Sequence, residues 1–184
     1  MQPLPADFFD FDAPSVARAL IGRCLLIEGV GGTIVETEAY AAGDPASHSY
    51  RGPTKRNASM FGPAGHAYVY LSYGMHIVLN LVCGARDGSA VLVRALEPTH
   101  GIDLMIERRG TSDPRLLCSG PGRLGQALGV TAAMDGAPLH RPPFFLGGEH
   151  DPHVVAGPRI GITRGTEAPW RYCRQGSRFL SRPV

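Results

Sequence analysis

The chain has 184 residues, the size of one ordinary domain, and its hydrophobic content of 43% is enough to bury a core. No apolar stretch is long enough to span a bilayer, and the first residues have neither the basic start nor the apolar run of a signal peptide. The formal net charge of +2 is too small to argue for a nucleic-acid partner by itself.

The N-terminal part predicts one helix followed by a β-hairpin. A helix is expected over residues 15–21, because Asp12 can cap its first turn. Strands are expected over residues 24–28 and 33–40, with a glycine-rich turn between them.

The middle of the chain predicts a functional loop and a second hairpin. Residues 41–65 show no periodicity and hold four glycines and three prolines, which is typical of loops that carry function. Strands are expected over residues 67–71 and 77–82, joined through Tyr73-Gly74-Met75, and another over residues 90–96.

The remaining residues predict helices over 99–109 and 122–128, loops with short strands over 131–157, and a late strand over 159–162. There is no internal repeat and no linker. We therefore expect residues 1–184 to form a single α+β domain built on a curved antiparallel β-sheet, with flanking helices and a protruding β-hairpin.

The cysteines predict no disulfide framework. They are far apart in the sequence and form no CxxC pair: Cys24, Cys83, Cys118 and Cys173. Composition favours reduced, buried thiols in a cytoplasmic protein.

The predicted strand over residues 33–40 is the first candidate site. Side chains alternate along a strand, so Glu36, Glu38 and Tyr40 share one face. Two carboxylates and a phenol on one face could perform acid–base chemistry on a flat substrate. A solvent-facing edge with its charges outward is the alternative.

The second candidate is the predicted hairpin around Tyr73. An aromatic side chain at a turn could act as a wedge that enters a base stack, whereas folding back onto the sheet is the alternative. The register is decisive for two further residues. A three-residue tip places Tyr70 and Asn80 on one face, and a two-residue tip separates them.

The basic residues are unevenly distributed. Arginine outnumbers lysine seventeen to one, and from Pro158 onwards six arginines face one acid, Glu167. An arginine-rich C-terminal face would suit a polyanion, and a solvated surface is the alternative. Lys55 is the only lysine, which favours a reaction with activated water over one through a Schiff base.

The histidines predict no metal site. His150 and His153 are the closest pair, but a proline lies between them and no third ligand is near. The sequence also has no dinucleotide fingerprint, phosphate-binding glycine loop or nucleophile elbow, so we expect neither a metal nor another cofactor.

Several segments, in order, resemble the alkyladenine (3-methyladenine) DNA glycosylase family. The similarity extends from about Phe8 to Ser181 and is carried by residues 35–40 (VETEAY), His48, 68–70 (YVY), 73–75 (YGM), Asn80, 92–98 (LVRALEP) and 118–124 (CSGPGRL). His76 stands where the family would have an aromatic residue, the loop between Tyr40 and His48 is one residue shorter, and residues 163–184 are only loosely similar.

The resemblance implies a monofunctional DNA glycosylase that starts base excision repair. Such an enzyme flips alkylated or deaminated purines (3-methyladenine, 7-methylguanine, hypoxanthine or ethenoadenine) out of duplex DNA and hydrolyses the N-glycosidic bond with a Glu-activated water. The expected partner is double-stranded DNA containing damaged purines. The protein is expected to be a cytoplasmic monomer, associated with the nucleoid if it is bacterial.

The resemblance also implies roles for the chemistry-bearing residues. Glu38, rather than Glu36, would be the general base that deprotonates water, and Arg94 would contact the flipped nucleotide and help to hold that water. Tyr73 would fill the gap in the duplex, and Arg123 would bind a phosphate.

The base pocket would be formed by Tyr40, His48 and Tyr70 as walls, with Asn80 rejecting guanine through its exocyclic amino group. Two rival functions remain open from the residues alone. One is a non-catalytic nucleic-acid-binding module, and the other is a hydrolase of small nucleosides that uses the Glu36 and Glu38 pair.

Overall fold

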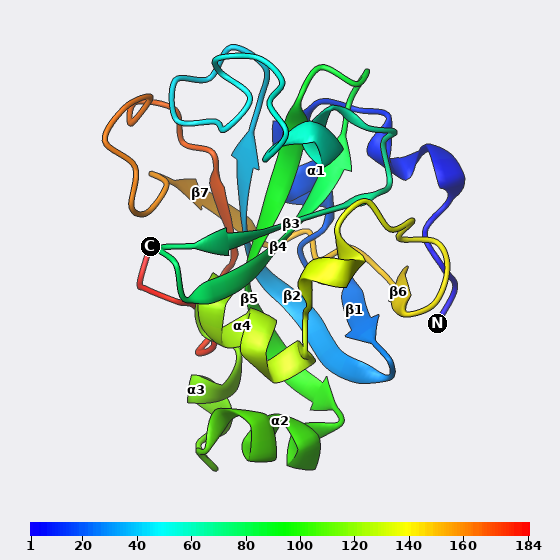
Figure 1. Cartoon of the computed structure of the whole chain (residues 1–184). Coiled ribbons are helices and arrows are strands. Elements are labelled where there is room, and N and C mark those ends of the chain that lie inside the picture. The colour runs from blue at the N-terminus through cyan, green and yellow to red at the C-terminus, as the bar shows by residue number, and fades with distance from the viewer.

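The computed structural model describes residues 1–184, the side chain of Ala6 excepted. Within the described residues, eight strands form one curled antiparallel sheet with helices packed around it (Figure 1). The strands are β1 (Cys24–Ile27), β2 (Val30–Tyr40), β3 (Ala67–Ser72), β4 (His76–Cys83), β5 (Ser89–His100), β6 (Phe144–Gly147), β7 (Val154–Gly157) and β8 (Arg171–Arg174). The helices are α1 (Ala13–Ala19), α2 (Ile102–Arg109), α3 (Pro114–Leu117) and α4 (Pro121–Leu128), with 3-10 turns η1 (Ala6–Phe9), η2 (Ala58–Phe61) and η3 (Ala132–Met134).

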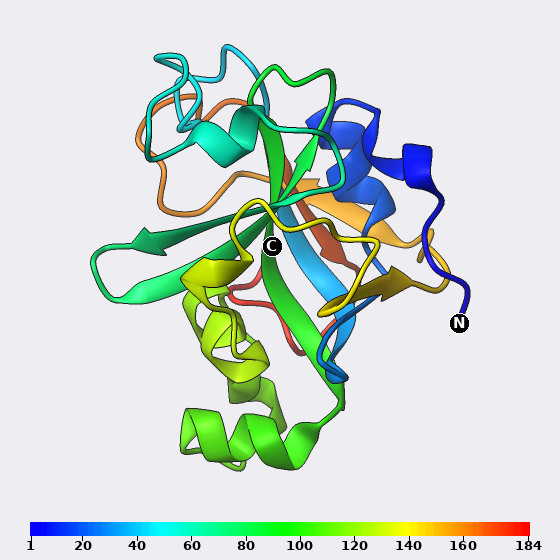
Figure 2. The same ribbon diagram turned by 45° about the vertical axis from the view of Figure 1, so that its right-hand side comes forward.

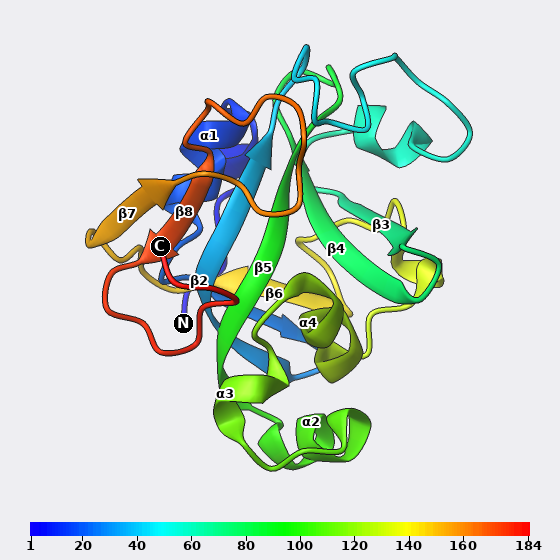
Figure 3. The same cartoon turned by 90° about the vertical axis from the view of Figure 1, so that its left-hand side faces the viewer.

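Strand β2 organises the sheet because its two halves have different neighbours. One edge pairs with β5 along most of its length. The other edge pairs with β1 over residues 30–33 and with β8 over residues 36–38. The register with β5 shifts on both sides of Glu36, and such bulges re-aim side chains next to active sites. The sheet therefore forks at the position of the two carboxylates (Figure 3).

The β3–β4 hairpin projects from the rest of the sheet (Figure 2). Ser72 pairs with His76, so the tip has three residues, and Tyr70 and Asn80 lie on one face as the three-residue register predicts. Tyr73 occupies the left-handed region with φ of 50°, a strained conformation for a residue with a side chain. The protruding hairpin predicted from the sequence is confirmed.

The main apolar core lies on the sheet face opposite the carboxylates. Helix α1 packs against β2 there, and the Thr37 hydroxyl donates a hydrogen bond to the Ala17 carbonyl at 2.8 Å. Helix α4 lies so close to β4 that a Cβ on Gly125 would come within 2.0 Å of the Ile77 carbonyl oxygen. Only glycine permits this approach, which places the helix against the start of β4, close to the hairpin tip.

Most predicted elements are confirmed with small shifts at their ends. Asp12 caps α1 by accepting a hydrogen bond from the Ser15 N–H. The helix expected over residues 99–109 begins later, at Ile102, because β5 continues to His100. None of the described helices is long and apolar enough to cross a membrane.

The late strand expected over residues 159–162 is wrong. This segment is a loop, and the strand that completes the sheet is β8. The buried free thiols are confirmed, and burial raises the pKa of Cys83, Cys118 and Cys173 to about 12.

Candidate active site

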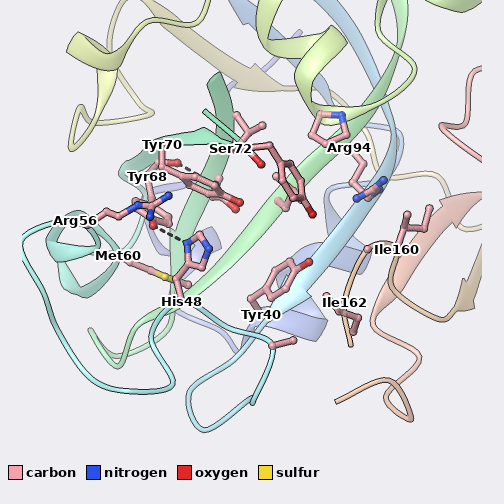
Figure 4. Close-up of a pocket in the computed structure, with 17 residues that line it drawn as sticks. Tyr40, His48, Arg56, Met60, Tyr68, Tyr70, Ser72, Arg94, Ile160 and Ile162 are labelled. Atoms are coloured by element: carbon pink, nitrogen blue, oxygen red, sulfur yellow. Dashed lines mark hydrogen bonds between the residues drawn. The ribbon is translucent and has the colours of Figure 1, made fainter. Parts of the chain in front are cut away.

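A cavity of about 440 Å³ opens on the face of the sheet that carries the carboxylates (Figure 4). One row of cross-strand partners runs below it through Glu38, Leu92, Asn80 and Tyr68, on β2, β5, β4 and β3. Directly opposed residues share a face, so the register alone brings these side chains together. The lining residues are Tyr40, Ala46, His48, Arg56, Met60, Tyr68, Tyr70, Ser72, Tyr73, Val78, Asn80, Leu92, Arg94, Pro121, Ile160, Gly161 and Ile162.

Glu38 is fully buried immediately behind the cavity wall. Its Oε2 accepts hydrogen bonds from the Tyr40 hydroxyl at 2.8 Å and from Arg94 Nη1 at 3.2 Å, and its Oε1 accepts from the Ile160 N–H at 2.7 Å. All three donor residues line the cavity. A carboxylate has about four acceptor sites, so Glu38 retains one, at Oε1, for a further donor such as water.

Glu36 is also fully buried, but of its three donor residues only Arg94 lines the cavity. Its Oε1 accepts from Arg94 Nε at 3.0 Å, Arg171 Nε at 2.8 Å and the Ser181 hydroxyl at 2.7 Å. Its Oε2 accepts from the Ser181 N–H at 2.6 Å. The expected sharing of one face is confirmed for Glu36, Glu38 and Tyr40 by these bonds, whereas the alternative of outward, solvated charges is wrong.

Tyr40 closes the cavity beside Glu38. Burial, and then the negative charge of Glu38, raise the pKa of Tyr40 well above its ordinary value, so the phenol remains protonated and serves as a donor. The guanidinium of Arg159 lies over the Tyr40 ring, with Cζ 4.9 Å from the ring centroid, and 5.1 Å from the centroid of Trp170.

Arg159 anchors the loop that replaces the predicted late strand. Its side chain is buried and bonds the Asp44 carboxylate twice, once from Nη2 to Oδ1 at 3.0 Å, and it donates to the Ala39 carbonyl at 2.9 Å. The loop is held by side-chain bonds instead of a strand ladder. This places the Ile160 N–H against Glu38, a contact that a local apolar pattern could not reveal.

Three aromatic rings form the opposite wall of the cavity. The His48 and Tyr70 rings meet edge to face with centroids 4.6 Å apart, and His48 Nδ1 hydrogen-bonds the Tyr68 hydroxyl at 2.9 Å. Burial, and then the positive charge of Arg56, lower the pKa of His48, which favours the neutral imidazole at neutral pH. Tyr68 belongs to the YVY motif, but no role was predicted for it, and the structure shows it as a further wall residue.

Asn80 lies buried at the base of the cavity, where its Nδ2 donates to the Tyr68 carbonyl at 3.2 Å. This hydrogen bond orients the amide between the hairpin strands. Six residues expected in the site therefore meet around one cavity: Tyr40, His48, Tyr70, Tyr73, Asn80 and Arg94.

The rim of the cavity is the hairpin tip. Tyr73 is 87% exposed and Met75 is 71% exposed, so the alternative in which Tyr73 folds back onto the sheet is wrong. His76, which departs from the family pattern, packs against Gly122 of α4. Arg123 on the same helix is exposed and donates to the Ser119 hydroxyl at 3.1 Å, outside the cavity lining.

The structure corrects the hypothesis that the C-terminal arginines form one basic surface. Arg159 and Arg171 are buried in ion pairs, and Arg174 binds Glu97 and Asp151. A more basic surface lies at a second cavity of about 270 Å³, which adjoins the first through His48, Arg56 and Tyr68. Three exposed arginines that form no ion pair within the described part of the chain line it: Arg51, Arg56 and Arg164.

Comparisons with known proteins agree with this geometry. The profile of the family described as methylpurine-DNA glycosylase (MPG) matches residues 7–178. A relative from Rhodopseudomonas palustris (strain HaA2), named as a candidate 3-methyladenine DNA glycosylase, is 56% identical over 183 residues, which cover 98% of this chain and 91% of the relative. Relatives of the same name from Nitrosospira multiformis and Rhizobium meliloti are 58% and 56% identical, and the matches cover 95% and 96% of this chain and 92% and 95% of theirs.

The protein is therefore a DNA glycosylase, a hydrolase that acts on N-glycosyl bonds and serves DNA repair. The resemblance inferred from the sequence motifs is confirmed. The chain belongs to the methylpurine-DNA glycosylase family.

Proposed function

We propose that this chain flips alkylated or deaminated purines out of duplex DNA and hydrolyses their N-glycosidic bond with a water activated by Glu38. The observation that carries the proposal is the remaining acceptor site of Glu38, next to a cavity that all three of its hydrogen-bond donors line. Glu36 differs because two of its three donor residues, Arg171 and Ser181, lie outside the cavity lining.

The chemistry follows from where positive charge develops. Glycosidic cleavage passes through an oxocarbenium-like sugar. A carboxylate that accepts the proton of water also stabilises this positive sugar, so Glu38 would serve both purposes. Arg94, bound to both glutamates, holds the Glu38 carboxylate in place and presents its guanidinium to the cavity.

The aromatic walls suit a flat, electron-poor base. Stacking on an aromatic side chain contributes roughly 1–3 kcal/mol per base, and a cationic alkylated purine gains cation–π attraction in addition. Tyr40, His48 and Tyr70 would form the stacking walls, and Asn80 at the base of the cavity would oppose the exocyclic amino group of guanine. Lys55 is exposed and lies outside the cavity lining, which supports hydrolysis by water without a Schiff base.

The test is single-turnover release of free base from duplex oligonucleotides that carry 7-methylguanine or hypoxanthine. Release of the base that leaves an intact abasic strand is expected for a monofunctional glycosylase. Cleavage of the DNA strand by the protein itself would indicate a reaction through a Schiff base with an amine instead. Tight duplex binding without any release would favour a binding module.

The Tyr73→Ala variant is expected to release base about tenfold more slowly under single-turnover conditions. The reason is that Tyr73 would replace the stacking lost when a base leaves the duplex, a contribution of roughly 1–3 kcal/mol. The thermal stability should be unchanged, since the side chain is 87% exposed. Met75→Ala, at the same tip, is the matched control, and an equal loss in both variants would contradict a specific wedge.

Acidification is expected to weaken binding of cationic lesions more than binding of neutral ones. His48 has a pKa below its ordinary 6.5, so it is neutral at pH 7.5 and becomes positive only when the pH falls below that lowered value. Its positive charge would then repel a cationic purine. Equilibrium binding of 7-methylguanine and hypoxanthine duplexes between pH 7.5 and 5.5 measures the difference. A His48→Gln variant with the same pH dependence as wild type would assign the effect elsewhere.

A further inference from the structure

The segment that follows β8 folds back across the sheet face beside β2 and β5 (Figure 3). Arg171 anchors it by donating hydrogen bonds to the backbone carbonyls of Arg182 and Pro183. Arg171 also binds Glu36 from its Nε. The buried glutamate and the returning segment are thus attached to the same guanidinium.

Ser181 is the point at which this segment meets the site. Its N–H and its hydroxyl both donate to Glu36, at 2.6 and 2.7 Å, and its hydroxyl oxygen accepts from Arg94 Nη2 at 3.4 Å. A hydroxyl has one donor and two acceptor positions, so both contacts can exist together. Ser181 therefore connects the carboxylate and the guanidinium from one side.

Arg94 is held through each of its nitrogens by a different partner. Its Nε binds Glu36 at 3.0 Å, its Nη1 binds Glu38 at 3.2 Å, and its Nη2 binds Ser181. A planar guanidinium with three fixed nitrogens cannot rotate without breaking a contact. Arg94 lines the cavity and Ser181 does not, so Ser181 can reach the site through Arg94, which it binds directly and also through Glu36.

We propose that Ser181 is a positioning residue that locks the Arg94 guanidinium against Glu38. This inference rests on the proposed role of Glu38 as the base that activates water. Without the Ser181 hydroxyl, Arg94 Nη2 has lost an acceptor and Glu36 Oε1 has lost a donor. The guanidinium can then turn away from Glu38, and the carboxylate loses the cation that keeps it oriented.

The test compares Ser181→Val with Ser181→Thr, two side chains of nearly equal shape that differ by the hydroxyl. The neighbouring Gly120 carries no side chain, and a Cβ built there would lie 4.0 Å from the Ser181 Cβ, so Ser181 is not crowded on that side. Ser177→Ala is the control on the same segment, because that hydroxyl accepts from the Phe179 N–H at 3.2 Å and makes no contact with the glutamates.

The readouts are the single-turnover rate of base release and the dissociation constant of the lesion duplex, in samples of confirmed fold. For Ser181→Val we expect a rate about tenfold lower and a dissociation constant within twofold of wild type, because a misplaced guanidinium disturbs the reaction more than the binding of the base. Ser181→Thr and Ser177→Ala should retain the wild-type rate and dissociation constant.

An unchanged rate in folded Ser181→Val, or equal losses in the Val and Thr variants, would overturn the role of Ser181. A Val variant that fails to fold beside a folded Thr variant would assign the hydroxyl to stability alone and would overturn it too. Absence of base release by the wild-type protein would refute the proposed function instead, so the two failures are distinguishable.

Discussion

The Glu38→Gln variant is expected to bind lesion-containing duplex like the wild type and to release base more slowly by roughly 10²–10⁴-fold. Glutamine keeps the size of the side chain and one acceptor oxygen, although its amide NH2 would replace the oxygen that accepts from the Ile160 N–H, and it cannot accept a proton from water. It also places an uncharged group where the sugar becomes positive, so both contributions of the carboxylate are lost together. Single-turnover release at saturating protein, beside a binding titration, separates the two effects.

The variant is expected to fold, because the glutamine oxygen can still accept hydrogen bonds from Arg94 and Tyr40. Its fold can be checked separately from its activity. A loss of binding that parallels the loss of rate would point to a disturbed pocket and not to missing chemistry. A rate of base release close to that of the wild type would show that Glu38 is not the general base.

Removal of the neighbouring carboxylate in Glu36→Ala is expected to cost about 3–5 kcal/mol of unfolding free energy. The charges of Arg94 and Arg171 would stay buried without their shared partner, and the Ser181 N–H and hydroxyl would lose their acceptor. Domains of this kind are stable by about 5–15 kcal/mol, so a large part of the total would be lost. Urea unfolding followed by circular dichroism measures the change.

Glu97→Ala is the matched control for Glu36→Ala. Glu97 also pairs with an arginine, Arg174, at 3.0 Å, but its side chain is 35% exposed. Solvent-exposed ion pairs contribute about 0–1 kcal/mol, so the control should unfold near the wild-type midpoint. Similar losses in both variants would show that burial of the Glu36 network adds nothing.

The parts of the site that could be predicted from the sequence are those built by local regularity. Alternation along one strand placed Glu36, Glu38 and Tyr40 on a common face, and the hairpin register placed Tyr70 with Asn80. The antiparallel sheet, the helices and the hairpin follow from the same periodicity and turn residues. The choice between the two glutamates came only from the family resemblance.

The parts that could not be predicted depend on contacts between distant residues. Arg159 and Ile160 were expected in a strand because their neighbours are apolar, but the ion pair with Asp44, 115 positions earlier, holds them in a loop. Ser181 gave no signal at all, since a serine becomes informative only when its partner is known. The arginines from Pro158 onwards were counted as one surface, although burial separates them into internal ion pairs and exposed side chains.

The fork in the sheet at β2 has a consequence for the order in which the protein matures. The β1–β2 hairpin is local and can form as soon as it leaves the ribosome. The half of β2 that carries the glutamates pairs instead with β8. Arg171 of β8 follows Glu36 by 135 positions in the sequence. Contacts of such separation form late in folding. Until then Arg94 on β5 can bind both carboxylates, but Glu36 lacks its contacts with Arg171 and Ser181. The active site of a nascent chain is therefore incomplete until nearly all of these residues have been synthesised. The protein becomes active only when its fold is complete.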